Sequence, residues 1–217
     1  NRPPAGALRG FGTPQLVWAY ESHTDLIARE LGVDPMAFRR QNILKNGRPQ
    51  AVGTTLVDTE IDGVLVELDR RMNWSGPFEK GEGTVKRGRG IAVGFKASIS
   101  PTTSMAIVNV NADGSVIVHC STTDMGQGSD TAMAQIAAEV LGVGVDKVIV
   151  IHPDTDVTPY DMSTLGSRST YHMGHAVRLA ATEARDKLAE MAKELNLPEG
   201  TNAPVDELFR RKYGMQA

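Results

Sequence analysis

The sequence is poor in cysteine, in aromatic residues and in long apolar runs. Its single cysteine, Cys120, excludes a disulfide within the chain and is typical of a reducing compartment. It also excludes an iron–sulfur cluster held by this chain alone, because such clusters need several thiolates. No apolar run approaches the roughly 18 residues of a membrane span, and no signal peptide is visible. We therefore expect a cytoplasmic protein with no membrane partner.

The charge of the chain is also close to balance. The 217 residues carry a net charge of -3, and the basic residues are scattered rather than gathered in blocks. This pattern predicts no nucleic-acid partner. Hydrophobic residues make up 41% of the chain, which is enough for the core of one large or two small domains. The sequence begins Asn-Arg-Pro-Pro, without an initiator methionine, so we expect a fragment of a longer subunit.

Helical periodicity dominates the first part of the sequence. Apolar residues at helical spacing predict helices over 13–31, 35–44 and 61–72. Thr13 and Pro14 have the residue types of an N-cap followed by a first helical position. Residues 74–89 are rich in Gly, Glu and Lys and predict an exposed loop. We expect a mainly helical domain over 1–89.

The pattern then changes to short strands and helices. Strands are predicted over 90–95, 104–110, 115–120 and 147–152, and helices over 129–141, 175–195 and 204–213. The turn Asn-Ala-Asp-Gly at 111–114 predicts a hairpin between the second and third strands. The order favours an α+β fold, with a helical N-terminal segment followed by a two-layer ββαβα unit over 90–217.

Three loops with small or glycine residues precede predicted helices. They are Arg9–Gly12, Asp124–Gly128 and Thr164–Thr170. We expect such loops to end in helix N-termini, where free backbone N–H groups and the helix dipole favour anions. Each loop alone could be a turn or a helix cap, but together they predict one extended ligand that carries phosphate.

Other polar groups are weaker candidates. His172 and His175, even with Asp161, provide too few ligands at fixed spacing for a metal site, so they are interpreted as surface or packing residues. Asp154, Asp156 and Asp161 are interpreted as solvated loop acids. No metal site made of the chain's own side chains is predicted.

With these motifs the chain resembles the molybdenum-cofactor-binding subunit of the xanthine dehydrogenase/aldehyde oxidase family of molybdenum hydroxylases. The resemblance rests on Ala-Leu-Arg-Gly-Phe-Gly-Thr-Pro-Gln at 7–15, Asp-Gly-Ser-Val at 113–116, Thr-Asp-Met-Gly-Gln-Gly at 123–128 and Gly-Ser-Arg-Ser at 166–169. It extends from Gly6 to about Leu188.

The resemblance implies a role for each matching residue. Arg9 and Gln127 would be the catalytic positions that orient the cofactor, and Phe11 would pack against a flat substrate. Many relatives place a second aromatic residue opposite the first; the corresponding residue here is Ile99, which disfavours a purine. The implied cofactor contacts are Arg9, Gly10, Met125, Gly126, Gln127, Gly166, Ser167 and Ser169.

The resemblance also implies the reaction and its partners. It implies hydroxylation of an aldehyde, purine or N-heteroaromatic carbon, with water as the oxygen source and molybdopterin or its cytosine dinucleotide carrying the molybdenum. Electrons would leave through iron–sulfur clusters and FAD on other domains or subunits. The family's catalytic glutamate would lie C-terminal to this stretch, in the remaining part of the molybdenum subunit. Two alternatives stay open: a non-catalytic assembly domain, and a phosphate- or nucleotide-binding enzyme with similar loops.

Overall fold

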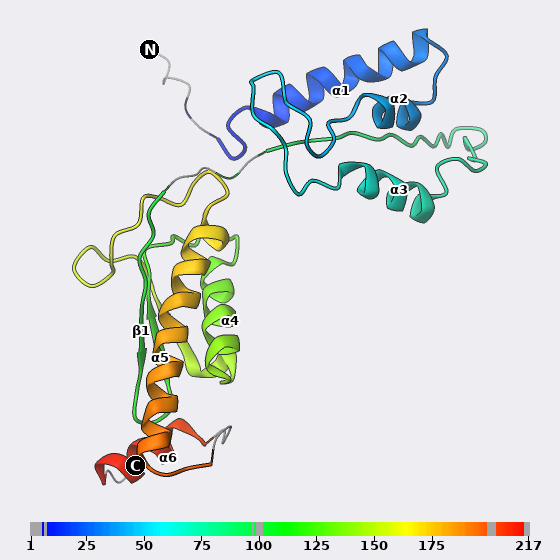
Figure 1. Cartoon of the computed structure of the whole chain (residues 1–217). Helices are drawn as coiled ribbons and strands as arrows, with labels where there is room; N and C mark the ends of the chain where they lie inside the picture. Colours follow the sequence, from blue (N-terminus) through cyan, green and yellow to red (C-terminus); the bar gives the residue numbers. More distant parts are fainter. Residues whose placement is uncertain (1–5, 7, 97, 99–101, 199–202, 215–217) are drawn as a thin grey trace. The chain divides into compact units, whose positions relative to one another are not determined.

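The protein, described by a computed structural model, forms two compact units, Asn1–Lys96 and Ala97–Ala217 (Figure 1). The structure describes residue 6, residues 8–96, residue 98, residues 102–198 and residues 203–214. Helices and a small sheet are both present, which confirms the α+β class. None of the helices in this described part has the length and apolarity needed to cross a membrane.

The first unit contains three helices, α1 (Thr13–Glu30), α2 (Pro35–Asn42) and α3 (Ile61–Met72). The carboxylate of Asp34 caps α2, because its Oδ1 accepts hydrogen bonds from the N–H groups of Met36 and Ala37, both at 2.9 Å. The prediction that Thr13 is the N-cap of α1 is wrong. Gly12, at φ 84°, precedes the helix, and Thr13 is already its first residue.

A small apolar core and a buried ion pair hold this unit together. Met36, Leu65, Trp74 and Ile91 form the core. The buried guanidinium of Arg39, on α2, contacts two carboxylates of α1: its Nε lies 2.7 Å from Glu21 Oε2, and its Nη1 lies 2.8 Å from Asp25 Oδ1. These contacts fix α2 against α1.

The prediction of a strand over 90–95 is wrong. This segment is extended, but no strand pairs with it in the described residues. Side chains of α1 satisfy its backbone instead. The N–H of Val93 donates to Glu21 Oε2 at 2.9 Å, and the hydroxyl of Tyr20 donates to the carbonyl of Val93 at 3.0 Å. A helix thus supplies the hydrogen bonds that a neighbouring strand would otherwise make.

The second unit is built on a three-stranded sheet in the order β1-β2-β3. β1 (Ile107–Val110) pairs antiparallel with β2 (Val116–His119), and β2 pairs parallel with β3 (Val148–Ile151). The predicted hairpin turn is confirmed: the N–H of Asn111 donates to the carbonyl of Ser115 at 2.8 Å, and Gly114 has φ 83°. A glycine is favoured at this left-handed position.

Two helices cover one face of this sheet, α4 (Ser129–Leu141) and α5 (Gly174–Glu194) (Figure 1). The short helical segments η1 (Val145–Lys147) and η2 (Ser169–Met173) precede β3 and α5, and α6 (Val205–Tyr213) follows α5. The core between sheet and helices is fully buried and consists of Val116, Val118, Cys120, Met133, Ala137, Met173 and Val177. Alternation along β2 directs its two valines into this core.

Candidate functional site

The loop before α1 takes up three consecutive left-handed backbone conformations. Gly10, Phe11 and Gly12 have φ values of 101°, 51° and 84°. A Cβ at Gly10 would lie 2.8 Å from Pro14 Cδ, so a larger residue would collide with the proline ring. Phe11 has a Cβ and holds such a conformation at a cost of about 1–3 kcal/mol. Strain of this kind clusters at functional sites, and here it falls on a predicted substrate contact.

The side chains of this loop are open to solvent. Phe11 is 47% exposed, and Arg9 is exposed with no ion pair to any residue that the structure describes. The ammonium nitrogen of Lys96 lies 5.7 Å from the centroid of the Phe11 ring. Ile99, the predicted counterpart of Phe11, lies outside the described residues. The loop therefore presents an aromatic ring with a lysine against it and an unpaired guanidinium two residues away.

The loop before α4 is closed by the side chain of Gln127. Its Oε1 accepts a hydrogen bond from the N–H of Met125 at 2.6 Å, and its Nε2 donates to the carbonyl of Thr123 at 2.7 Å and to Ser129 Oγ at 3.1 Å. Met125 is 62% exposed at the tip of the loop. Gly126, at φ 96°, provides the conformation that this tight closure needs. In this conformation the amide of Gln127 shapes the loop.

A carboxylate already occupies the N-terminus of α4. Asp124 accepts hydrogen bonds from the N–H groups of Gly126 at 2.7 Å and Asp130 at 3.2 Å. These backbone donors, Gly126 first, hold the pKa of the Asp124 carboxyl below its usual value. The expectation of a free helix N-terminus at this loop is therefore wrong, because a resident anion uses the donors.

The loop before η2 keeps its donors unused. Gly166 and Ser167 are both left-handed, at φ 64° and 61°. The backbone N–H groups of Gly166, Ser167 and Ser169, and both serine hydroxyls, donate to no acceptor in the part of the chain that the structure describes. Consecutive N–H groups in left-handed or turn conformations make concavities that bind anions. This loop can hold a phosphate.

Arg168, in the middle of the same motif, points inward. Its side chain is fully buried, and its Nη1 lies 2.7 Å from Asp161 Oδ1. The interpretation of Asp161 as a solvated acid is wrong, because only 2% of its side chain is exposed. The guanidinium also donates to a set of oxygens on neighbouring loops, Thr102 Oγ1, Ser104 Oγ and the carbonyls of Thr103 and Ser163. Sequence reasoning missed this role, for which the motif Gly-Ser-Arg-Ser offered the only signal.

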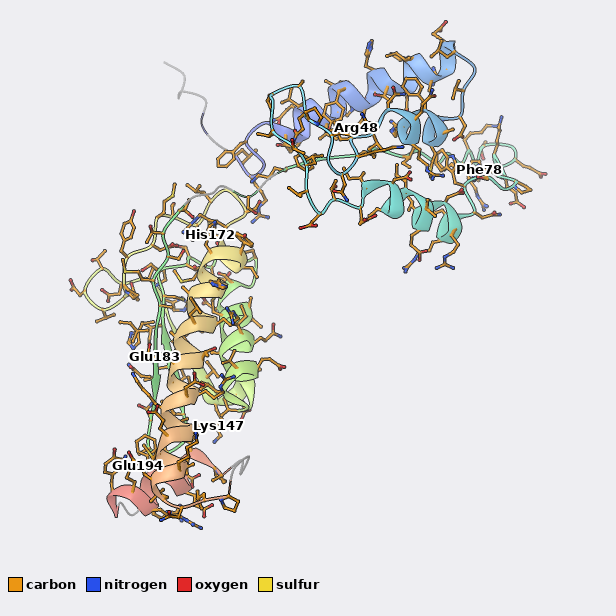
Figure 2. All side chains as sticks on the ribbon, viewed as in Figure 1. Arg48, Phe78, Lys147, His172, Glu183 and Glu194 are labelled. Carbon is orange, nitrogen blue, oxygen red and sulfur yellow. The ribbon has the colours of Figure 1, made fainter. Side chains whose placement is uncertain are left out.

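The second and third loops adjoin. The N–H of Thr123 donates to Thr164 Oγ1 at 2.8 Å, so the loop closed by Gln127 lies beside the one that carries Ser167. Both lie at the end of the second unit where α4 and α5 begin. Figure 2 shows this end of α5 at His172, with Glu194 at the opposite end. The Arg9 loop belongs to the first unit.

The described residues were also compared with the requirements of a metal site and of a reactive thiol. Among the described residues, no group of three or more His, Cys, Asp or Glu side chains could hold a metal ion. Cys120 is fully buried, and desolvation raises the pKa of its thiol. A protonated, buried thiol is a poor nucleophile.

Comparison with known proteins extends these observations. Residues 64–213 match a family model described as a molybdopterin cofactor-binding domain, and residues 1–43 match a second model with the same description. The chain is 34% identical over 197 residues to the xanthine dehydrogenase molybdenum-binding subunit of Escherichia coli O157:H7, covering 87% of this chain and 26% of that protein.

Two further likenesses concern aldehyde oxidoreductases. The enzyme of Megalodesulfovibrio gigas is 31% identical over 217 residues, covering 96% of this chain and 23% of that protein. The solved structure of the aldehyde oxidoreductase from Desulfovibrio gigas has a TM-score of 0.73 at 27% identity, covering 88% of this chain and 23% of that chain. The chain thus spans about a quarter of the length of these relatives.

Proposed function

The chain belongs to the molybdopterin cofactor-binding domain family, and from this premise we propose that it holds the cofactor within a larger molybdenum hydroxylase. The resemblance to the xanthine dehydrogenase/aldehyde oxidase family is confirmed by the relatives named above. The single observation that carries the proposal is the set of unused donors in one loop: the N–H groups of Gly166, Ser167 and Ser169.

These donors fit the phosphate of a pterin cofactor. Gly166 and Ser167 are both left-handed, a conformation found in loops whose N–H groups bind anions, and the hydroxyls of Ser167 and Ser169 add two more donors. Hydrogen bonds to a charged phosphate contribute about 1.5–3 kcal/mol each. The buried Arg168, paired with Asp161, holds the loop from within.

The other two loops carry the remaining cofactor contacts of the proposal. Met125, Gly126 and Gln127 contact the pterin, with Gln127 keeping their loop closed. Arg9 and Gly10 would hold the metal end of the cofactor. The bound cofactor supplies the two-electron oxidation of an electron-poor carbon. Phe11 receives a flat substrate on its exposed ring. Ile99 stays a predicted substrate contact and lies outside the described residues.

The rest of the proposal concerns the whole enzyme. Its substrate is an aldehyde, purine or N-heteroaromatic compound, and electrons pass to iron–sulfur and flavin partners in the cytoplasm. The relatives called xanthine dehydrogenase molybdenum-binding subunit and aldehyde oxidoreductase support this reaction class. The division into a helical domain, 1–89, and a two-layer ββαβα unit, 90–217, stays a prediction; the first compact unit of the structure extends to Lys96.

Molybdenum and pterin content tests the proposal directly. The full-length protein, purified with the subunits that accompany it, is expected to carry about one molybdenum per copy, by the one-site stoichiometry that the loops imply. A Ser167→Ala/Ser169→Ala double variant should retain the pterin at least about tenfold less tightly, because two charge-assisted hydrogen bonds are lost. Ser163→Ala, an exposed hydroxyl of the same segment, is the matched control.

The outcomes separate the alternatives. Normal pterin retention in the double variant would contradict the phosphate role of this loop. Absence of molybdenum and pterin from the wild-type protein, even after reconstitution, would contradict the whole proposal and favour an assembly domain. A tightly bound nucleotide without molybdenum would instead favour a nucleotide-binding enzyme.

A further inference from the structure

The strand β1 has an open side. Among the described residues it pairs with β2 alone, in the sheet order β1-β2-β3. The N–H of Asn111 donates to the carbonyl of Ser115, so the odd-numbered residues of β1 direct their backbone groups towards β2. The N–H and C=O groups of Val108 and Val110 point away from β2, and no residue in the described part of the chain is hydrogen-bonded to them. The outer side of β1 is therefore a row of unpaired donors and acceptors.

The residues of β1 give this edge no protection. Edge strands in natural proteins usually carry a charged residue, a proline or a bulge, which discourages further pairing. The sequence of β1, Ile-Val-Asn-Val, has no charge and no proline, and its pairing with β2 runs without a bulge from Ile107 to Val110. The side chain of Ile107 is 48% exposed. β1 thus has the composition of an inner strand at the position of an outer one.

An apolar groove follows the same edge. It has a volume of about 640 Å³ and lies between β1, α5 and α6. Figure 1 shows α5 beside β1. The only charged residues of the lining, Glu183 and Lys187, pair with each other at 2.7 Å. The apolar part of the lining includes Val108, Val110, Ala184, Leu188, Met191 and Phe209. The groove therefore accepts apolar side chains and leaves no charge for an occupant to balance.

We propose that an extended segment from the remaining part of the molybdenum subunit pairs with β1 and fills this groove. The proposal takes from the proposed function only the larger subunit, since three quarters of the length of the relatives lies outside the match. An added strand supplies partners for the backbone groups of Val108 and Val110, and alternate side chains of that strand enter the groove. A helix cannot do this, because its backbone groups bond to one another.

Hydrogen–deuterium exchange, resolved to single residues, tests the pairing in the full-length protein purified with its partner subunits. The amide of Asn109 is the internal reference, because it faces β2. We expect the amides of Val108 and Val110 to exchange as slowly as that of Asn109, at least about 100-fold more slowly than an exposed amide. Slow exchange at Asn109 with fast exchange at both valines would overturn the proposal.

Photocrosslinking identifies the occupant in the same preparation. p-Benzoylphenylalanine replaces Glu183, an exposed residue at the groove, and in a matched control it replaces Glu190, an exposed glutamate of α5 outside the groove. We expect the Glu183 position to link to a peptide of the same polypeptide, outside residues 1–217, that carries apolar residues at alternate positions. The Glu190 position should not link to that peptide. Mixing unlabelled and nitrogen-15-labelled protein distinguishes links within one copy from links between two copies.

Each result decides the proposal. Slow exchange at both valines, together with a link within one polypeptide, supports it. A link to a second copy or to an iron–sulfur or flavin partner overturns it, because the occupant is then a different chain. Failure of the Glu183 position to give any product also overturns it, since a filled groove brings C–H bonds within reach of the benzophenone. Absence of molybdenum would contradict the proposed function, and neither experiment depends on the metal.

Discussion

Arg168 and Asp161 form an ion pair whose two side chains are both buried, with Nη1 2.7 Å from Oδ1 and exposed fractions of 0% and 2%. Arg168 stands in the same motif as Gly166, Ser167 and Ser169, the residues proposed to hold phosphate. Arg168 also joins this loop to the segment that contains Thr103, whose carbonyl accepts from its Nη2 at 2.8 Å. A motif that suggests anion binding by arginine instead uses that arginine to position the loop.

Removal of the buried carboxylate should destabilise the protein strongly. Asp161→Ala leaves the Arg168 guanidinium buried without its counter-charge, and such a loss costs about 3–5 kcal/mol. Equilibrium urea unfolding measures the change in the free energy of unfolding. Asp186→Ala, which removes the exposed partner of Arg185, should change it by less than about 1 kcal/mol. A loss below about 1 kcal/mol for Asp161→Ala would show that the pair does not hold the fold.

The Asp124 carboxylate at the N-terminus of α4 should make the stability of the protein depend on pH. The pKa of the Asp124 carboxyl is lowered in the folded state, mainly by the N–H of Gly126. The stabilisation is therefore present above the unfolded-state pKa of about 3.9 and is lost as pH falls through the folded-state pKa. We expect wild type to be more stable than Asp124→Asn at pH 6, with the difference shrinking towards pH 3. Thermal unfolding at both pH values measures it; a constant difference would contradict the role of the charge.

Close packing between α4 and α5 should limit the size of residue 174. A Cβ at Gly174 would lie 2.9 Å from Ile136 Cδ1, the mobile end of a side chain. Gly174→Ala should therefore cost less than about 1 kcal/mol, whereas Gly174→Leu should cost about 1–3 kcal/mol through overpacking. Chemical denaturation distinguishes the two variants. Equal stability of both would show that the helices can separate at this point without loss.

Loss of the exposed arginine should affect activity and leave the fold intact. Arg9 has no ion pair among the residues described, so Arg9→Ala removes no contact that the fold needs. In the complete enzyme, we expect kcat/KM to fall by about tenfold or more, the equivalent of one lost charge-assisted hydrogen bond. Steady-state kinetics and thermal unfolding are compared with Arg29→Ala, an exposed arginine at the end of α1. Unchanged turnover would remove Arg9 from the site.

Local sequence signals predicted the second unit well. The apolar run Val116–Val118 and the turn ending at Gly114 indicated the hairpin, and the period-3.6 pattern indicated α4 at its observed bounds, Ser129–Leu141. These signals are local, because each depends on a repeat or a turn residue within a few positions. The three loops were predicted for the same reason. Their glycines can be read from the sequence, and glycine is the residue type that favours left-handed turns.

Contacts between residues far apart in the chain could not be predicted from the sequence. The extended segment at Val93 looks like a strand, but its hydrogen bonds go to Glu21 and Tyr20 of α1. Lys96 contacts the ring of Phe11 although the two residues are 85 positions apart in the sequence, and no periodicity predicts that contact. The burial of Asp161 could not be predicted either, because an acid in a polar loop has the same local sequence pattern whether it contacts solvent or pairs with an arginine.

The sequence by itself determined where helices, the hairpin and the three loops occur, and its motifs indicated the family. Only the tertiary structure decided which loop donors remain unused. Asp124 satisfies one helix N-terminus and Gln127 closes its own loop. In the Gly166–Ser169 loop, Arg168 turns inward to Asp161, and the N–H groups of Gly166, Ser167 and Ser169 meet no acceptor among the described residues. Whether a donor is free depends on the acceptors that folding brings within about 3 Å, and spacing along the chain does not specify them.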